Sequence, residues 1–258
     1  MKYKLRPSGS SRWLACPASL VLGATIETEK RNDMIAAYTG TAAHTILERC
    51  VKGQHRADKY LGTTVEVFDE EQQEFPYTAQ VDEKMVAAVN FFLDEVGEPD
   101  SVTRGTVYSE VEMQHSEIPE LKGTADYLRI DEVEKHGILA DLKNGKSIVQ
   151  VKNKKGEINT QLMSYACLVF DLFEDLETLT LAIIQPNGST KLKTRSTGIN
   201  RKDASLHLDR VREAARLAEE ATEATLDVIT SEGSWCWYCP AKSICPSRGK
   251  ASVEKDFG

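Results

Sequence analysis

The stretch from residue 106 to residue 143 decides the fold, and it reads TVYSEVEM at 106–113, GTADYLRI at 123–130 and GILADLK at 137–143. The first segment alternates polar and apolar residues, and the other two carry short apolar runs, as β-strands do. Polar turns separate the three segments. The pattern therefore predicts a three-stranded meander.

Helical periods flank this meander. Apolar residues recur at helical spacing in 41–51 (TAAHTILERCV, with Thr41 as the expected N-cap), in 79–96 and in 157–172. Residues 178–184 (TLTLAII) predict a buried strand, and 201–228 a long helix with a polar face. The order predicts an α/β fold, with a mixed central sheet flanked by helices and with a C-terminal helix.

Size and charge limit the function. The chain has 258 residues, 41% of them hydrophobic, which is enough for one sizeable core. Its net charge of -8 means that a nucleic-acid site would be a local groove rather than a basic surface. No apolar run approaches the roughly 20 residues that span a bilayer, and the start, MKYKLRPSGSSRW, lacks a secretory pattern. We expect a cytoplasmic protein that folds as a single domain.

Two carboxylates and an amine are expected to converge where the second and third strands meet. Asp126 lies in the second strand, while Asp141 and Lys143 share one face at the end of the third. Carboxylates are hard oxygen ligands for Mg²⁺ or Mn²⁺, and such an ion activates water for phosphodiester hydrolysis. An isolated D-x-K is more often a strand end with a solvated lysine, so its surroundings have to decide.

Four residues elsewhere could join this centre. Gln161 and Tyr165 lie one helical turn apart and could contact a phosphate or a base, although Tyr165 also fits the apolar stripe of its helix. His44 could supply a nitrogen ligand or be an ordinary helix histidine. Glu110 could add a carboxylate or face solvent at the strand edge.

The cysteines predict a second metal centre. Cys236, Cys239 and Cys245 follow C-x2-C-x5-C, and Cys16 lies near the other terminus. Four thiolates suit either Zn²⁺ or an iron–sulfur cluster, and the spacing does not separate the two. Closure of such a centre would hold residues 1–35 and 201–258 together as a lobe beside a core of about 36–200. Neighbouring aromatic residues would shield it, namely Trp235, Trp237 and Tyr238.

A lysine-rich segment, KNGKSIVQVKNKKG at 143–156, follows the third strand in an otherwise acidic protein. It is either a track for DNA phosphates or a solvated hairpin, and its proximity to Asp141 favours DNA. Its candidate DNA-binding residues are Lys146, Lys152, Lys154 and Lys155.

Taken together, these motifs resemble the PD-(D/E)xK nuclease superfamily, in particular its RecB-like and Cas4-like branch and an uncharacterised phage-encoded group. The resemblance covers most of the chain and rests on GTAAH (40–44), GTAD (123–126), DLK (141–143) and QLMSY (161–165), in the family's order. It implies a restriction-endonuclease-like core and a protein of a bacterial or phage-infected host cell. The sequence departs from the commonest pattern by having Asp141 where glutamate is frequent.

The resemblance also implies roles for individual residues. His44, Asp126, Asp141 and the backbone carbonyl of Leu142 would bind Mg²⁺ or Mn²⁺, and Lys143 would serve catalysis. Two further residues, Gln161 and Tyr165, would organise the DNA. The four cysteines resemble the [4Fe–4S] staple of Cas4-like and AddB-like nucleases, which favours iron over zinc.

We therefore expect a metal-dependent DNA nuclease, an exonuclease rather than an endonuclease, in DNA recombination, repair or phage DNA metabolism. Recombination or replication proteins are the expected partners. The alternatives are a non-catalytic DNA-binding recombination accessory protein with the same fold and a zinc-stapled interaction module. Polarity, strand preference and oligomeric state stay open. The sequence has no G-x4-G-K-[ST] phosphate loop, so any helicase activity would come from a partner.

Overall fold

A mixed five-stranded sheet forms the centre of the computed structural model, which describes residues 3–26, 35–69, 74–97, 104–222, 224–226 and 228–247. The strands are β3 (Thr106–Gln114), β4 (Lys122–Asp131), β5 (His136–Leu142), β6 (Thr178–Ile184) and β7 (Thr194–Asn200), in that spatial order. Strands β3, β4 and β5 pair antiparallel, which confirms the meander. Strand β6 runs parallel to β5, and β7 antiparallel to β6.

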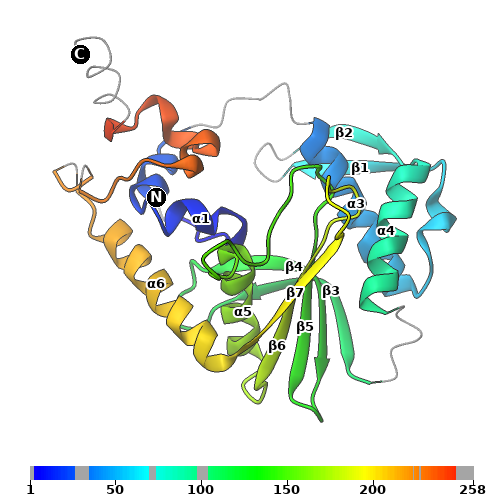
Figure 1. Cartoon of the computed structure of the whole chain (residues 1–258). Helices are drawn as coiled ribbons and strands as arrows, with labels where there is room; N and C mark the ends of the chain where they lie inside the picture. The colour runs from blue at the N-terminus through cyan, green and yellow to red at the C-terminus, as the bar shows by residue number, and fades with distance from the viewer. Residues whose placement is uncertain are drawn as a thin grey trace.

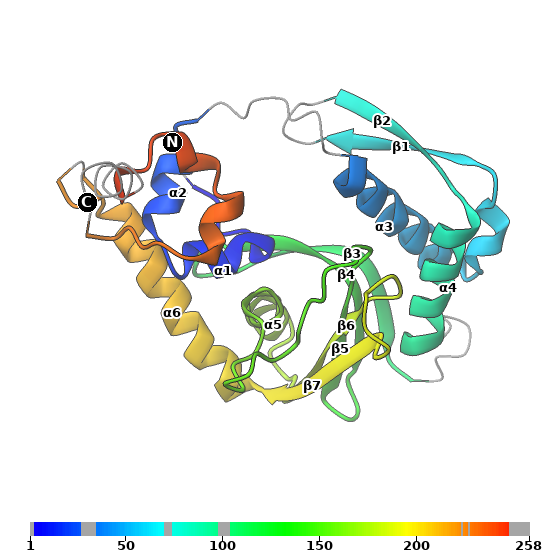
Figure 2. The same ribbon diagram turned by 45° about the horizontal axis from the view of Figure 1, so that its top comes forward.

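Helices cover both faces of this sheet (Figures 1 and 2). Helix α5 (Thr160–Leu172) connects the parallel strands β5 and β6 and packs against α6 (Arg201–Glu219). Helices α3 (Ile35–Gly53) and α4 (Glu83–Val96), with the hairpin of β1 (Thr64–Asp69) and β2 (Glu74–Gln80), cover the other face. The mixed sheet flanked by helices and the C-terminal helix are therefore as predicted.

The alternation of side chains along each strand explains why both faces are covered. Leu139 of β5 and Leu181 of β6 belong to the hydrophobic cluster that includes α5 and α6. Their neighbours Ala140 and Ala182 belong to the cluster that includes α3 and α4. Because successive side chains of a strand point to opposite faces, strands with apolar residues at every position need cover on both.

Several predicted helix boundaries were wrong, and three of them differ most. The predicted helix 79–96 begins at Glu83, because residues 79 and 80 complete β2 and Asp82 caps the helix by accepting a hydrogen bond from Met85 N (2.8 Å). Helix α3 begins at residue 35, so Thr41 lies inside it rather than at its N-cap. Helix α6 ends at Glu219, nine residues before the predicted end.

The two ends of the described chain lie side by side. Short helices near the N-terminus, α1 (Ser10–Trp13) and α2 (Ala18–Gly23), contact the 3₁₀ segments η3 (Ser234–Tyr238) and η4 (Pro240–Ser243) near the C-terminus (Figure 2). Ser231 Oγ donates a hydrogen bond to Ala15 O (2.5 Å). Among the described helices, none has both the length and the apolar character that crossing a bilayer requires.

Helix α6 presents a buried histidine to α5. His207 is 4% exposed, and its Nε2 lies 3.0 Å from Ser164 Oγ. Burial, aided by the positive charge of Arg210, lowers the pKa of His207 to about 4. The folded protein therefore holds this imidazole neutral at pH values where the unfolded chain, with its ordinary histidine pKa, is protonated.

We expect this histidine to make folding sensitive to mild acid. Between pH 6.5 and 4 the unfolded chain binds a proton that the folded chain does not, so stability falls as the pH drops. The effect should reach roughly 3 kcal/mol at its limit. Urea unfolding should be measured for wild type and His207→Asn at pH 7.5 and at pH 4.5. Between these pH values the unfolding free energy of wild type should fall by more than that of the variant. A difference that is the same at both pH values would contradict this.

Candidate active site

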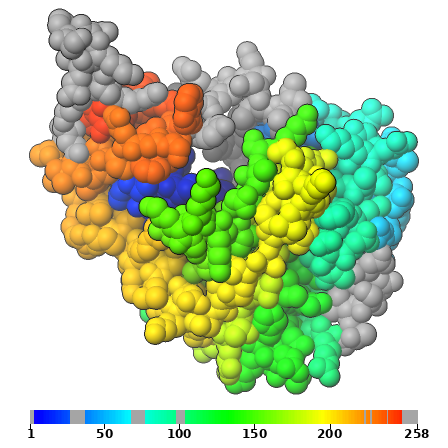
Figure 3. All heavy atoms as spheres, in the orientation of Figure 1, coloured from blue at the N-terminus to red at the C-terminus, as the bar shows by residue number. Residues whose placement is uncertain are grey.

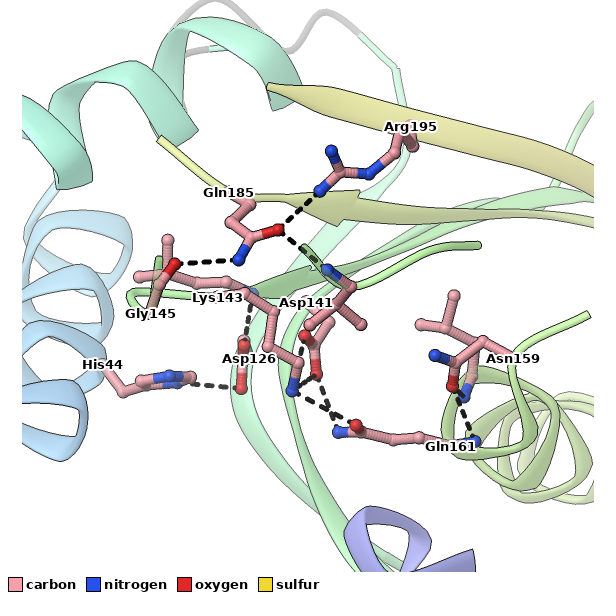
Figure 4. Close-up of polar contacts among 12 residues, drawn as sticks. His44, Asp126, Asp141, Lys143, Gly145, Asn159, Gln161, Gln185 and Arg195 are labelled. Atoms are coloured by element: carbon pink, nitrogen blue, oxygen red, sulfur yellow. Dashed lines mark hydrogen bonds and ion pairs between the residues drawn. The ribbon is translucent and has the colours of Figure 1, made fainter. Parts of the chain in front are cut away.

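Asp126, Asp141 and Lys143 lie together where β4 and β5 meet (Figure 4). Asp126 Oδ2 accepts a hydrogen bond of 2.7 Å from Leu142 N, on the neighbouring strand. Lys143 follows the end of β5, and its backbone N donates to Ile184 O of β6 (2.9 Å). The sheet therefore holds both carboxylates on regular backbone, while the lysine stands at the start of a loop.

A three-residue network surrounds Asp141. Lys143 Nζ lies 2.9 Å from Asp141 Oδ2 and also donates to Gln161 Oε1 (3.2 Å). Gln161 Nε2 donates to Asp141 Oδ1 (2.9 Å). Gln161 stands in the first turn of α5, which Asn159 caps by accepting hydrogen bonds from Gln161 N and Leu162 N. The sequence pattern singled out Gln161 but missed Asn159, although an asparagine just before an apolar helical stripe is a recognised capping signal.

His44 reaches the site from α3, which covers the face of the sheet opposite to α5 (Figure 4). Its Nδ1 lies 3.0 Å from Asp126 Oδ1 and 3.7 Å from Glu110 Oε1. The imidazole side chain is 28% exposed, so it lies between the buried carboxylate and the surface. Asp126 is thus held by a strand on one side and faces a helix on the other.

Glu110 joins the site through an unusual backbone conformation. Its φ is 48°, in the left-handed region that residues other than glycine rarely occupy. Ser109 and Val111 on either side of it keep their pairing with β4. Such a conformation costs on the order of 1–3 kcal/mol and persists where the surroundings enforce it. Within the described parts of the chain, Glu110 Oε1 is buried and makes no hydrogen bond, only the ion-pair contact with His44, in contrast to the solvent-facing position that was the alternative.

The charges of the site shift one another's pKa values. Burial raises the pKa of Asp141 to about 6, and the charge of Asp126 adds to this against the opposing effect of Lys143. Burial also acts on Asp126, but His44 outweighs it and lowers the pKa of that carboxyl. Burial disfavours the charged imidazole of His44, yet the neighbouring carboxylates raise its pKa well above 6.5. The carboxylates of Asp126 and Asp141 therefore stabilise a positive charge placed between them, whether it is carried by His44 or by a bound cation.

The donor atoms fit a hard divalent cation. His44, Glu110 and Asp126 each offer one nitrogen or oxygen, and these atoms lie within 4.8 Å of one another. Asp141, which the family resemblance also implies as a ligand, stands outside that compact group, and its carboxylate contacts Lys143 and Gln161. The backbone carbonyl of Leu142 as a further ligand stays a prediction. Glu110 Oε1, which is buried and makes no hydrogen bond to the described residues, is the kind of acceptor that a cation satisfies.

Tyr165 lies at the edge of this site and is half-buried. Burial raises its pKa, and the charges of Asp126 and Asp141 add to that effect. The ring is also packed close to Gly123. Tyr165 is therefore both near the carboxylates and part of the packing around them, and its contact with DNA stays a prediction.

The candidate DNA-binding lysines are exposed on the segment after β5, namely Lys146, Lys152, Lys154 and Lys155. Lys152 bridges to Ile158, and Gly156 N donates to Asn153 O (3.0 Å), so the end of this segment is a tight hairpin. The hairpin geometry agrees with both sequence interpretations, and the phosphate track stays a prediction.

The four cysteines near the termini line one pocket, which Trp235 and Ala241 also line. Burial raises the pKa of the Cys16 thiol, and the neighbouring Cys239 and Cys245 add to the increase. Of the aromatic residues expected to shield this place, Trp235 lines the pocket but Trp237 is 74% exposed, and the side chain of Tyr238 is outside the described residues.

Comparison with known proteins gives a family and two remote structural likenesses. A family model described as "Protein of unknown function (DUF2800)" matches residues 3–257. The crystal structure of a phage related exonuclease from Haemophilus somnus 129PT is similar with 16% identity and a TM-score of 0.37, over 85% of this chain and 93% of that one. The crystal structure of SSO0001 is similar with 18% identity and a TM-score of 0.33, over 63% of this chain and 71% of that one. Both TM-scores lie below 0.5, so neither likeness extends to function.

We expect the close packing at Gly123 to be needed for this site. An added Cβ would lie 2.8 Å from Pro7 Cδ and 3.0 Å from Tyr165 Cε1, so Gly123→Ala should destabilise the protein by about 1–3 kcal/mol. Gly198→Ala is the matched control, because a Cβ there meets nothing within 4 Å. Urea unfolding should separate the two variants, and equal changes in their unfolding free energies would contradict the expectation.

Proposed function

The chain belongs to this DUF2800 family, and we propose that it is a metal-dependent deoxyribonuclease, an exonuclease rather than an endonuclease, that uses Mg²⁺ or Mn²⁺. The observation that carries the proposal is the adjacency of two sets of groups. A compact group of cation ligands lies beside a buried carboxylate, which is paired with the amine of Lys143 and the amide of Gln161. Neither set by itself points to this chemistry, but together they supply what metal-dependent hydrolysis of a phosphodiester uses: a site for the cation and charged groups beside it for the reacting phosphate.

His44, Glu110 and Asp126 would hold the cation, and Asp141 stands next to them as a further carboxylate. When bound, a divalent cation supplies a water of lowered pKa and neutralises charge on the phosphate. The neighbouring carboxylates raise the pKa of His44, and the charge of Asp126 adds to the effect of burial in raising the pKa of Asp141, so the pocket holds several negative charges close together. A cation in the pocket would offset that charge.

Lys143 and Gln161 would position the reacting groups. Lys143 carries a positive charge that can approach a phosphate oxygen and stabilise negative charge that develops on it. Gln161 contacts both Lys143 and Asp141, so it fixes the orientation of each. Tyr165, one turn further along α5, would contact the DNA beside the scissile bond.

We expect Asp141→Asn and Lys143→Ala each to reduce degradation of linear DNA at least about a hundredfold in Mn²⁺, since each removes a charged group at the reacting phosphate. The assay uses end-labelled linear, circular and single-stranded DNA with Mg²⁺, Mn²⁺ or EDTA. Activity confined to linear DNA supports an exonuclease.

Asp209→Asn is the matched control, because Asp209 is an exposed carboxylate on α6. It should retain wild-type activity. Full activity in Asp141→Asn would exclude the proposed role. A wild-type protein that binds DNA without turnover in any metal would favour the non-catalytic accessory protein instead.

We further propose that Cys16, Cys236, Cys239 and Cys245 bind a [4Fe–4S] cluster that staples residues 1–35 and 201–258 into one lobe. All four cysteines line the same pocket although two segments of the chain far apart in sequence carry them. Four thiolates around one enclosed space are the ligand set of such a cluster and equally of Zn²⁺, so metal content distinguishes them.

Anaerobically purified protein should be brown and contain about four iron atoms per chain. Cys16→Ala should lose the iron and lower the melting temperature, since the metal links the two ends of the chain. Cys50→Ala is the control, because Cys50 is buried in α3 and stands outside the pocket. A colourless protein with one zinc per chain would mean that the four cysteines bind zinc and not an iron–sulfur cluster. A metal-free protein would exclude the metal centre.

A further inference from the structure

Two loops begin at the catalytic edge of the sheet, and hydrogen bonds join them. Residues 143–149 follow β5 and residues 185–193 follow β6; we call them the paired loops. Ser189 N donates to Lys146 O (3.1 Å), and Asn187 Nδ2 donates to Asn144 Oδ1 (2.7 Å). The two loops lie side by side on one face of the molecule, in green and yellow in Figure 3.

The buried side-chain amide of Gln185 connects the two loops. Gln185 has no exposed surface, and its Nε2 donates to Gly145 O (2.8 Å) and Ser147 O (2.6 Å). Its Oε1 accepts hydrogen bonds from Val149 N (3.1 Å) and Arg195 Nη2 (2.7 Å). Every hydrogen-bonding capacity of the amide is thus used, three of the four within the first loop (Figure 4).

Arg195 extends the same support to the second loop. It is 8% exposed, and its Nη1 donates to Leu192 O (2.8 Å) while its Nη2 donates to Gln185. A guanidinium is expensive to bury without hydrogen bonds, and the planar fork of Arg195 holds its two acceptors in a fixed geometry. The buried Gln185–Arg195 pair therefore holds the two loops in position relative to each other, beside the end of β5 where Lys143 stands.

The surface that this pair holds is basic and partly apolar. The only charged residues of the two loops are Lys143, Lys146, Lys191 and Lys193, in a chain whose net charge is -8. Lys146 and Lys191 are exposed. Ile148 and Leu192 are 44% and 63% exposed, which leaves apolar surface beside the lysines. A polyanion with apolar sugars between its charges complements such a surface.

We propose that the paired loops form one DNA-binding surface, in which Lys146 and Lys191 contact phosphates and the Gln185–Arg195 pair acts as positioning residues. The inference rests on the proposed function and deepens it, because it adds the β6–β7 loop to the substrate site. Lys191 and Arg195 carry no motif, so only the contacts between the loops point to them.

The test measures binding of a labelled duplex oligonucleotide by fluorescence anisotropy in Ca²⁺, so that turnover is not required. Lys146→Ala/Lys191→Ala should weaken binding on the order of tenfold at 0.1 M salt, and should reduce the slope of log affinity against log salt by about 1.8. Lys135→Ala/Lys202→Ala is the matched control. Those lysines are exposed at the opposite ends of β5 and β7 from the paired loops, and their replacement should leave the slope unchanged.

Gln185→Glu tests the positioning role. This variant keeps the acceptors for Arg195 and Val149 but loses the donors to Gly145 and Ser147. We expect the melting temperature to fall, because two buried carbonyls lose their donors, and DNA affinity to fall several-fold at temperatures where the variant is still folded. Wild-type DNA affinity in Gln185→Glu would overturn its role, and the lysine variants test the surface even if this variant does not fold.

The outcomes separate this inference from the proposed nuclease. Wild-type protein that binds DNA through the paired loops but never cleaves it would support the surface and contradict the nuclease. Cleavage by wild type together with unchanged binding in Lys146→Ala/Lys191→Ala would overturn the surface alone. Equal weakening in the control variant would also overturn it, because general electrostatic attraction would then explain the binding.

Discussion

The carboxylate of Asp126 connects the three parts of the chain on which the site depends. One oxygen accepts the backbone N–H of Leu142 from β5, and the other faces His44 of α3. A buried carboxylate costs several kcal/mol unless charge and hydrogen bonds compensate it, so strand and helix must both be in place for this side chain to be tolerated. The spacing between α3 and the sheet is therefore coupled to the chemistry of the site.

The same requirement accounts for features that would otherwise only destabilise the protein. Glu110 has a left-handed backbone conformation that brings a second carboxylate to His44, and it retains a buried oxygen without a hydrogen bond. Asp141 has a raised pKa because it is buried beside Asp126. Strain and unpaired acceptors of this kind gather at functional sites, where a ligand can satisfy them.

Regular packing lies around this costly centre. The sheet is covered on both faces, and a fully paired amide, Gln185, secures the loops that follow β5 and β6. Beside the site, Trp13 is almost wholly buried and donates from Nε1 to Arg6 O (2.9 Å), and the helix α1 that carries it contacts both α5 and the C-terminal segment η3. Such supports hold side chains in position without taking part in chemistry.

The sequence by itself determined the elements with strong periodicity, which are β3 to β6 and the helices α3 to α6, because alternation and helical spacing are local properties. It did not predict β7, whose residues TRSTGIN are largely polar, or the hairpin of β1 and β2. It also singled out Asp126, Asp141, Lys143, His44 and Gln161 from residue type and order.

Tertiary structure alone decided which atoms meet. Glu110 completes the compact ligand group, Asp141 pairs with Lys143 and Gln161, and Gln185 and Arg195 join two loops. Those contacts depend on a backbone distortion at one residue and on packing between segments far apart in the chain, and neither leaves a periodic signal in the sequence.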